Sequence, residues 1–481
     1  MTFNSFAFAV FVPVVLALHF ALPHRLRWVL QLVASYVFYL WWRLDYGLLL
    51  LFSTYLDWWV SNRLGRTEGV GARKALLGVS LVGNLGLLFA FKYYNLFNDV
   101  GRRAVGVDWP LPPSDLILPV GISFYTFQTL SYAIDVYRRD IQPEPNFFRF
   151  ALFVSYWPQL VAGPIERAGR LLPQLFVPRP WDSERAASGL RLALWGMFKK
   201  VVVADRLGPI ADAIYADPAN VSGPAVVIGT VCFGWQIWCD FSGYSDIAIG
   251  CARVMGVDLM KNFDQPHLAS SVTDYWRRWH LSLTTWFTDY VYKPLGGSRG
   301  GLLSKYRNIV FVFVLSGLWH GANWSIVMWG LSNGLLLVVD EVTRPARLAF
   351  YGLTRLDRFP KLLHAMCVVG TLPIMYLTYP FFRSPDLGAW WKLVRNLPDG
   401  WGTGRAMAFF ERIDMMPWFF VATMSLIVIV EIGEYLHRDE HVAAWTARQP
   451  PAVRGARDLL LIVAVLFAGS WTAQPFFYFQ F

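Results

Sequence analysis

The chain has 481 residues, of which 55% are hydrophobic and only 16% are charged, and it is rich in Trp, Tyr and Phe. Because soluble domains average about 25% charged residues, this composition excludes an ordinary soluble protein and is typical of a polytopic membrane protein. The net charge of +10 comes from short basic clusters between apolar runs, a pattern that indicates membrane topology rather than nucleic-acid binding.

Apolar runs recur along the whole chain. A helix needs about 20 residues to cross about 30 Å of hydrocarbon, and some of the runs are short enough to be tilted or re-entrant. We therefore predict an all-α polytopic protein with about 11–13 membrane helices in a single domain, residues 1–481. The predicted ranges are 6–22, 29–42, 46–60, 75–91, 116–137, 148–165, 189–204, 224–251, the hairpin 308–342, 362–382, 417–436 and 458–475.

The basic residues predict the orientation of these helices. Arg25 and Arg27 follow the first apolar run and no basic residue precedes it, so we expect an uncleaved first span with its N-terminus outside. Later basic clusters, at residues 63–74, 138–139, 344–361 and 437–457, fit the same scheme and put the C-terminus outside.

The four cysteines show no CxxC spacing. Two of them lie seven residues apart, which is about 10 Å along a helix and too far for a disulfide. We expect all four to be buried, small apolar residues: Cys232, Cys239, Cys251 and Cys367.

Two carboxylates interrupt the apolar run CDFSGYSDIAIGC, residues 239–251. A charge at the centre of a bilayer costs at least about 2.5–3.5 kcal/mol, and such residues usually mark function. Asp240 and Asp246 are six residues apart and do not share a helix face. They are either an acid and a base, or caps of helix ends exposed by a break at Gly243.

The stretch SSVTDYWRRWHLSLTTWFTDYVYKPLGG, residues 270–297, predicts an amphipathic helix at the membrane interface. Arg277 lies off its apolar stripe, and Thr273 and Asp274 are candidate N-caps. His280 lies on the stripe and is either functional or an interfacial histidine satisfied by a neighbouring carbonyl. The stripe consists of Trp276, His280, Leu283 and Phe287.

A second histidine, His320, lies in the apolar stretch GLWHGANWSIVMWG, residues 317–330. Two crossings need roughly 40 residues, but the hairpin 308–342 supplies only about 35. Its rising arm, 308–320, reaches only about 18 Å. We therefore expect a break at residues 321–323, below the outer surface, that projects His320 into a polar cavity.

The chain ends in FFYFQF. This cluster is either an aromatic anchor at the membrane interface or a means of presenting the Tyr478 phenol at the outer surface.

Two histidines at membrane depth allow three kinds of chemistry. A metal site is disfavoured because no third ligand accompanies the pair. A proton relay in a transporter and a general base for acyl transfer to a hydroxyl are equally supported by the residues alone. We expect the transfer to be direct rather than through a serine acyl-enzyme.

Several blocks resemble the membrane-bound O-acyltransferase (MBOAT) superfamily, in particular its bacterial alginate- and cellulose-type polysaccharide O-acetyltransferase branch. They span most of residues 116–342, which we take as the catalytic core. The blocks are LVAGPIERAGRLLPQL (160–175), CDFSGYSDIAIGCARVMGVDL (239–259), NFDQPHLASSVTDYWRRWHLSLTTWFTDYVYKPLGG (262–297), SGLWHGANWSIVMWG (316–330) and the terminal FFYFQF.

The resemblance implies a fold with re-entrant helices around a central tunnel, in the bacterial inner membrane with periplasmic termini. It implies an acyl thioester donor such as cytosolic acetyl-CoA, with no cofactor or metal. It also implies as partners a periplasmic SGNH-hydrolase-like acetyltransferase and a polysaccharide synthase or secretion complex, besides membrane lipid. A transporter of the acyl donor and a scaffold without chemistry are the alternatives.

The resemblance also assigns roles to residues. His320 matches the near-invariant catalytic histidine and His280 the second one. Tyr478 matches a terminal motif that relays the acyl group outward. The residues expected to line the tunnel or support it are Asp240, Asp246, Arg277, Trp319 and Asn323.

Overall fold

The computed structural model describes residues 1–105, 113–161, 163–402, 406–438, 449–471 and 476–477. Over these residues the regular elements are helices, and no strand occurs, which confirms the all-α prediction. They cluster into two compact units. The first contains Met1–Ala193, Tyr244–Lys261 and the described part of 475–481, and the second contains Leu194–Gly243 and the described part of 262–474.

Each predicted apolar range contains a helix, but residues 116–121, 156–161 and 163–165 are not helical. Their bounds up to residue 197 are α1 Phe6–Ala21, α2 His24–Leu40, α3 Tyr46–Leu64, α4 Val70–Leu88, η1 Phe89–Tyr93, α5 Tyr94–Val105, α6 Ile122–Arg138, α7 Phe147–Ser155, α8 Ala168–Phe176 and α9 Ser183–Met197. Those that follow are η2 Phe198–Ala204, α10 Asp205–Tyr215, α11 Gly223–Val254, η3 Pro266–Leu268, α12 Val272–Trp276, α13 Leu281–Phe287, η4 Thr288–Tyr292, α14 Gly301–His320, α15 Trp324–Leu353, η5 Leu356–Arg358, α16 Pro360–Tyr376, α17 Tyr379–Arg383, α18 Leu387–Asn396, α19 Ala406–Arg412, α20 Pro417–Arg438 and α22 Pro451–Ala468.

Within the described residues, six helical stretches are long and apolar enough to cross a membrane, so the chain is a multi-pass membrane protein. Membrane crossing by the shorter or more polar helices stays a prediction, as does the single domain. The six stretches are Val70–Arg102, Gly223–Val254, Gly301–His320, Trp324–Leu353, Pro360–Arg383 and Pro417–Leu436.

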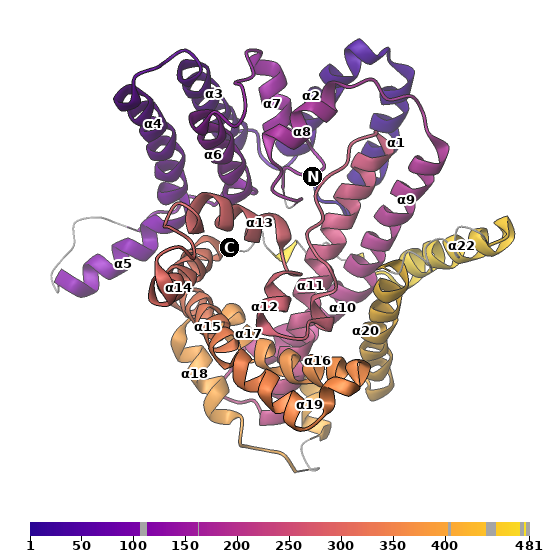
Figure 1. Ribbon diagram of the computed structural model, residues 1–481. Coiled ribbons are helices and arrows are strands. Elements are labelled where there is room, and N and C mark those ends of the chain that lie inside the picture. The colour runs from indigo at the N-terminus through magenta and orange to yellow at the C-terminus, as the bar shows by residue number, and fades with distance from the viewer. Residues whose placement is uncertain (106–112, 162, 403–405, 439–448, 472–475, 478–481) are drawn as a thin grey trace. The chain divides into compact units, whose positions relative to one another are not determined.

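In the first unit, α3, α4 and α6 lie side by side (Figure 1). The Asp57 carboxylate on α3 is buried and accepts hydrogen bonds from Ser80 Oγ at 2.5 Å and Asn84 Nδ2 at 2.8 Å, both on α4. Ser53 Oγ donates to Asn84 Oδ1 at 2.5 Å. Since hydrocarbon offers no hydrogen-bond partners, these polar groups satisfy one another and join the helices.

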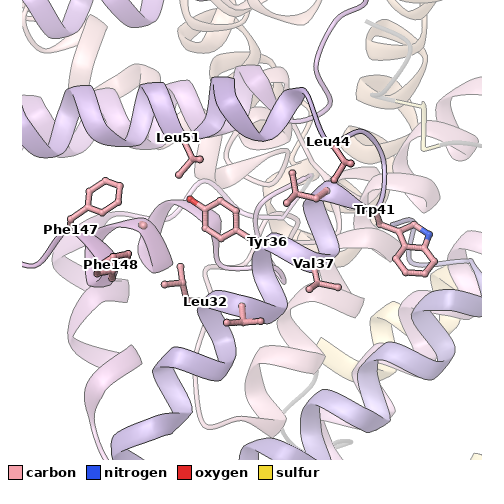
Figure 2. A pocket seen from close by; sticks show the side chains of 11 residues that line it. Leu32, Tyr36, Val37, Trp41, Leu44, Leu51, Phe147 and Phe148 are labelled. Atoms are coloured by element: carbon pink, nitrogen blue, oxygen red, sulfur yellow. The ribbon is translucent and has the colours of Figure 1, made fainter.

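An apolar groove of about 590 Å³ also lies in the first unit, along α2, α3 and α7. Figure 2 shows the side chains that line it, with the phenol of Tyr36 among aliphatic and aromatic groups. The lining offers no histidine, carboxylate or amine, so it lacks the groups that acyl transfer requires. The groove suits hydrocarbon and is not the candidate active site.

Helix α11 runs without interruption from Gly223 to Val254, so the predicted break at Gly243 is wrong, and with it the reading of Asp240 and Asp246 as caps. The glycine serves close packing instead. A Cβ on Gly243 would lie 2.6 Å from the carbonyl oxygen of Gly196, so only glycine allows α9 to approach α11 this closely.

The prediction of four buried cysteines holds for three of them. Cys232, Cys239 and Cys251 are buried, whereas Cys367 is half-buried on α16, with its sulfur 3.5 Å from the Tyr351 hydroxyl.

Candidate functional site

The α14–α15 hairpin (Figure 1) lies in the second unit. His320 is the last residue of its first arm, α14. The predicted break at residues 321–323 is confirmed. Asn323 caps α15, because its Oδ1 accepts a hydrogen bond from Ile326 N at 2.8 Å. The arms pack closely at paired glycines: a Cβ on Gly317 would lie 3.2 Å from the Cα of Gly330.

The predicted length of the rising arm is wrong. Helix α14 begins at Gly301 rather than at residue 308, because the polar residues that precede Asn308 are helical. Its 20 residues rise about 30 Å, which is enough to cross a bilayer. The predicted depth of His320, which depended on a short rising arm, therefore loses its support.

The single amphipathic helix predicted around His280 is also wrong. Helix α12 ends at Trp276, α13 begins at Leu281, and His280 lies between them with φ 46° and ψ 55°. This left-handed conformation costs about 1–2 kcal/mol in a residue with a side chain. Neither helix is long enough to span a membrane.

The N-cap of α12 is Ser271, whose Oγ accepts a hydrogen bond from Asp274 N at 3.1 Å, not Thr273 or Asp274. Thr273 is engaged elsewhere, since its hydroxyl donates to Asp340 Oδ2 at 2.6 Å and its backbone N–H to the same oxygen at 3.1 Å. Asp340 therefore ties α12 to α15.

The structure brings the two predicted histidines together. The ring centroids of His280 and His320 lie 6.3 Å apart, and the residues are 1% and 4% exposed. Aromatic rings surround this histidine pair, and we call them the aromatic cage. The cage consists of Phe241, 4.6 Å from His280; Trp319, 6.2 Å from His280 and 4.9 Å from His320; and Trp329 and Phe382, 5.1 and 5.4 Å from His320.

Burial in this cage lowers the pKa of His280 to about 3. An apolar environment disfavours the charged imidazolium, so His280 is neutral around pH 7. A neutral imidazole both accepts and donates a hydrogen bond, and it can hold or take the proton of a hydroxyl.

The other predicted residues differ in their surroundings. Trp319 is a wall of the cage, Asn323 is a helix cap, and Arg277 is exposed. Asp240 is buried and its Oδ1 lies 2.7 Å from Lys200 Nζ, which also donates to Asp205 at 2.8 Å. Asp246 is half-buried on the same helix but in the first unit. Tyr478 lies outside the described residues.

Sequence reasoning missed a third buried histidine in the second unit. His267 Nδ1 lies 3.1 Å from Glu431 Oε1 on α20, and the ring lies against Trp235 at 3.9 Å. Lys199 Nζ likewise bonds Glu434 Oε1 at 2.9 Å. The signal was present, because two glutamates within the apolar run 417–436 require partners.

No group of three or more His, Cys, Asp or Glu side chains among the described residues is arranged to hold a metal ion.

Comparison with known proteins places this geometry in a family. The model of the membrane-bound O-acyltransferase family matches residues 122–352. The probable alginate O-acetylase AlgI of Azotobacter vinelandii is 38% identical over 399 residues, which cover 82% of this chain and 77% of that protein. The chain belongs to the MBOAT family.

Other MBOAT proteins resemble the chain over most of its length. The probable alginate O-acetylase AlgI of Pseudomonas aeruginosa is 38% identical over 82% of this chain and 75% of its own. The peptidoglycan O-acetyltransferase of Helicobacter pylori is 29% identical over 93% of this chain and 90% of its own. This MBOAT protein is a membrane O-acyltransferase.

Proposed function

We propose that this protein moves an acetyl group from a cytosolic thioester such as acetyl-CoA across the bacterial inner membrane, for O-acetylation of an exopolysaccharide such as alginate or cellulose. The observation that carries the proposal is the buried pair of imidazoles inside the region that matches the family. The similar proteins are named as probable alginate O-acetylases and a peptidoglycan O-acetyltransferase, which supports the acetyl group and a glycan as final acceptor.

The chemistry is a direct transfer. His320 takes the proton of the acceptor hydroxyl, or holds that hydroxyl in place, while its oxygen attacks the thioester carbonyl. The new C–O bond forms as the C–S bond breaks, and the thiolate leaves with the proton. His280, neutral and next to His320, orients the reacting groups. Exclusion of water by the aromatic cage protects the thioester from hydrolysis.

The proposal extends to the surroundings of the enzyme. Both termini face the periplasm, where Tyr478 receives the acyl group and passes it outward. An SGNH-hydrolase-like acetyltransferase in the periplasm, next to a polysaccharide synthase or secretion complex, then modifies the polymer. Full acetylation in a Tyr478→Phe variant, which keeps the ring and loses the hydroxyl, would support the anchor role instead.

The test of His320 is its replacement by alanine. We expect His320→Ala to abolish acetyl transfer in cells at normal membrane abundance, because the proton acceptor is lost. The matched control is His364→Ala, an exposed histidine on α16, which should retain full acetylation. Unchanged polymer acetylation in His320→Ala would refute the assignment.

The transporter and scaffold alternatives give different results in vesicles. An enzyme releases free thiol from acetyl-CoA in the presence of acceptor, and His320→Ala abolishes that release. A transporter moves the donor without releasing thiol, and a scaffold tolerates His320→Ala.

A further inference from the structure

A separate segment of the second unit, residues 262–264, forms hydrogen bonds with the backbone before and after His280. We propose that Asn262 is a positioning residue that holds the left-handed turn at His280 and thereby orients the imidazole relative to His320. The proposal rests on the proposed function, because it gives Asn262 a role only if His280 takes part in the transfer.

Residues 262–264 contact both sides of the turn at His280. After His280, Leu281 N donates to the carbonyl oxygen of Asn262 at 2.8 Å, and Ser282 Oγ donates to Asn262 Oδ1 at 2.6 Å. Before it, the Arg278 carbonyl accepts from Asp264 N at 2.9 Å. His280 is therefore fixed between anchored neighbours.

Asn262 makes two of these three contacts, one with its backbone and one with its amide. It is 1% exposed, and Ser282 is fully buried. A buried hydroxyl–amide bond resists exchange with water, so it holds its geometry firmly. The first turn of α13 is tied to Asn262 at two successive residues, and this fixes where the helix can begin.

The same segment also supports the rings around the histidine. Phe263 packs edge-on against Trp279 at 5.1 Å and against Phe241 at 5.1 Å. Phe241 is the cage residue that contacts His280. The residue after Asn262 therefore sets the wall beside the imidazole while Asn262 sets the backbone under it.

Loss of the amide should shift His280 without removing it. A strained backbone persists only where its surroundings over-determine it, and a misplacement of about 1 Å in a reacting group can cost about 100-fold in rate. We expect Asn262→Ala to lower kcat by about 10- to 100-fold with little change in KM for acetyl-CoA, because every side chain of the histidine pair and the aromatic cage is still present.

The experiment measures thiol release from acetyl-CoA by the full-length protein in proteoliposomes, together with thermal stability. Ser282→Ala removes the same hydrogen bond from the other side and guards against misfolding of the Asn262 variant. Since one bond is shared, the double variant should be no slower than the slower single variant. Ser282→Thr keeps the hydroxyl and should retain most of kcat.

The matched control is Asn62→Ala. Asn62 also joins two segments through its amide, which donates to the carbonyl oxygens of Trp58 and Glu144, but it lies in the first unit. This variant should lose stability and keep kcat. The same pattern in Asn262→Ala, lower stability with normal kcat, would mean a merely structural role and would overturn the proposal.

The outcomes also separate this proposal from the proposed function. If His280→Ala is inactive while Asn262→Ala and Ser282→Ala keep full kcat, the positioning role is wrong and the function stands. If His280→Ala retains full activity, the role of His280 in the transfer fails, and the role of Asn262 fails with it.

Discussion

At the scale of single residues, His280 combines two demands that few side chains meet. Its backbone is left-handed, and burial in an apolar cage keeps its ring uncharged around pH 7. Asparagine meets both demands in part, because it enters the left-handed region more readily than most residues and carries a neutral donor and acceptor. Alanine meets neither.

We therefore predict that His280→Asn retains more transfer activity and a higher melting temperature than His280→Ala. The difference in stability should be about 1 kcal/mol, the order of the left-handed strain. Both quantities can be measured on detergent-purified protein. Equal losses in the two variants would show that the imidazole itself, rather than a neutral hydrogen-bonding group, is required.

Glu166 is a second residue whose charge depends on burial. It lies outside the membrane-spanning segments, and its side chain is fully buried. Burial raises the pKa of Glu166 to about 7, although Arg170 and the backbone N–H of Met260 favour the charged form. Because the folded pKa lies above the ordinary value of 4.5, the folded state binds a proton more tightly between these values.

Stability should therefore fall as the pH rises from about 4.5 to about 7, by an amount on the order of 1–3 kcal/mol. Glu166→Gln removes the titrating group, so its melting temperature should change less between pH 5 and pH 8 than that of the wild type. Glu68→Gln, at an exposed glutamate, is the control and should behave as the wild type. A wild-type dependence that persists in Glu166→Gln would contradict the prediction.

At the scale of elements, the close packing of α14 and α15 depends on glycines that cannot be enlarged. A Cβ on Gly330 would lie 2.3 Å from the carbonyl oxygen of Phe313, and a backbone atom cannot move aside as a side chain can. The arms would have to separate, and His320 ends one of them.

Gly330→Ala should therefore destabilise the protein by about 1–3 kcal/mol and lower its activity. Gly370→Ala on α16 is the matched control, because a Cβ there meets no atom within 4 Å. Alanine at that position should be neutral or stabilise by up to about 1 kcal/mol. Thermal melting of both variants checks the pair, and a stable, active Gly330→Ala would show that the arms tolerate separation.

The limits of sequence reasoning also appear at this scale. Apolar periodicity located the helices, but it gave one helix across residues 270–297 where the structure has α12, α13 and η4. The turn at His280 depends on Asn262, which lies 18 residues earlier and leaves no trace in local periodicity. Likewise, hydropathy could not show that Ser304 to Arg307 are helical, since polar residues at a helix end look like a loop.

At the scale of the whole molecule, polar contacts between side chains hold α20 within the second unit. Glu434 on α20 accepts hydrogen bonds from Lys199 Nζ at 2.9 Å and from Trp195 Nε1 at 2.8 Å, and Glu431 on the same helix pairs with His267. The Lys199 side chain is 2% exposed. A charge left alone in such a place costs several kcal/mol.

Lys199→Met and Glu434→Gln should each destabilise the protein by about 3–5 kcal/mol, because each leaves one buried charge without its partner. The double variant should lose less than either single one, since no uncompensated charge remains and the glutamine oxygen can still accept from Trp195. Melting temperatures of the three variants test this. A double variant whose loss equals the sum of the single losses would mean that the two charges do not interact.

Some features of the whole molecule could be predicted from the sequence and others could not. Composition and apolar runs predicted the membrane class and the helices, and the motifs predicted the two histidines. Each of these signals lies within a short stretch of the sequence. The aromatic cage could not be predicted from the sequence, since Phe241 and Phe382 come from helices far apart in the chain. Lys200 as the partner of Asp240 was equally hidden, because only packing shows which buried charges meet.

One wall of the cage comes from outside the segment that the family model matches. Phe382 contacts His320 from the short helix α17, which lies beyond the segment that matches the family, residues 122–352. A substitution outside the residues that the family model matches can therefore change the space beside the His320 imidazole. Redesign of the chain for a bulkier acyl group would therefore begin at Phe382, where a smaller side chain enlarges the site and leaves both histidines in place.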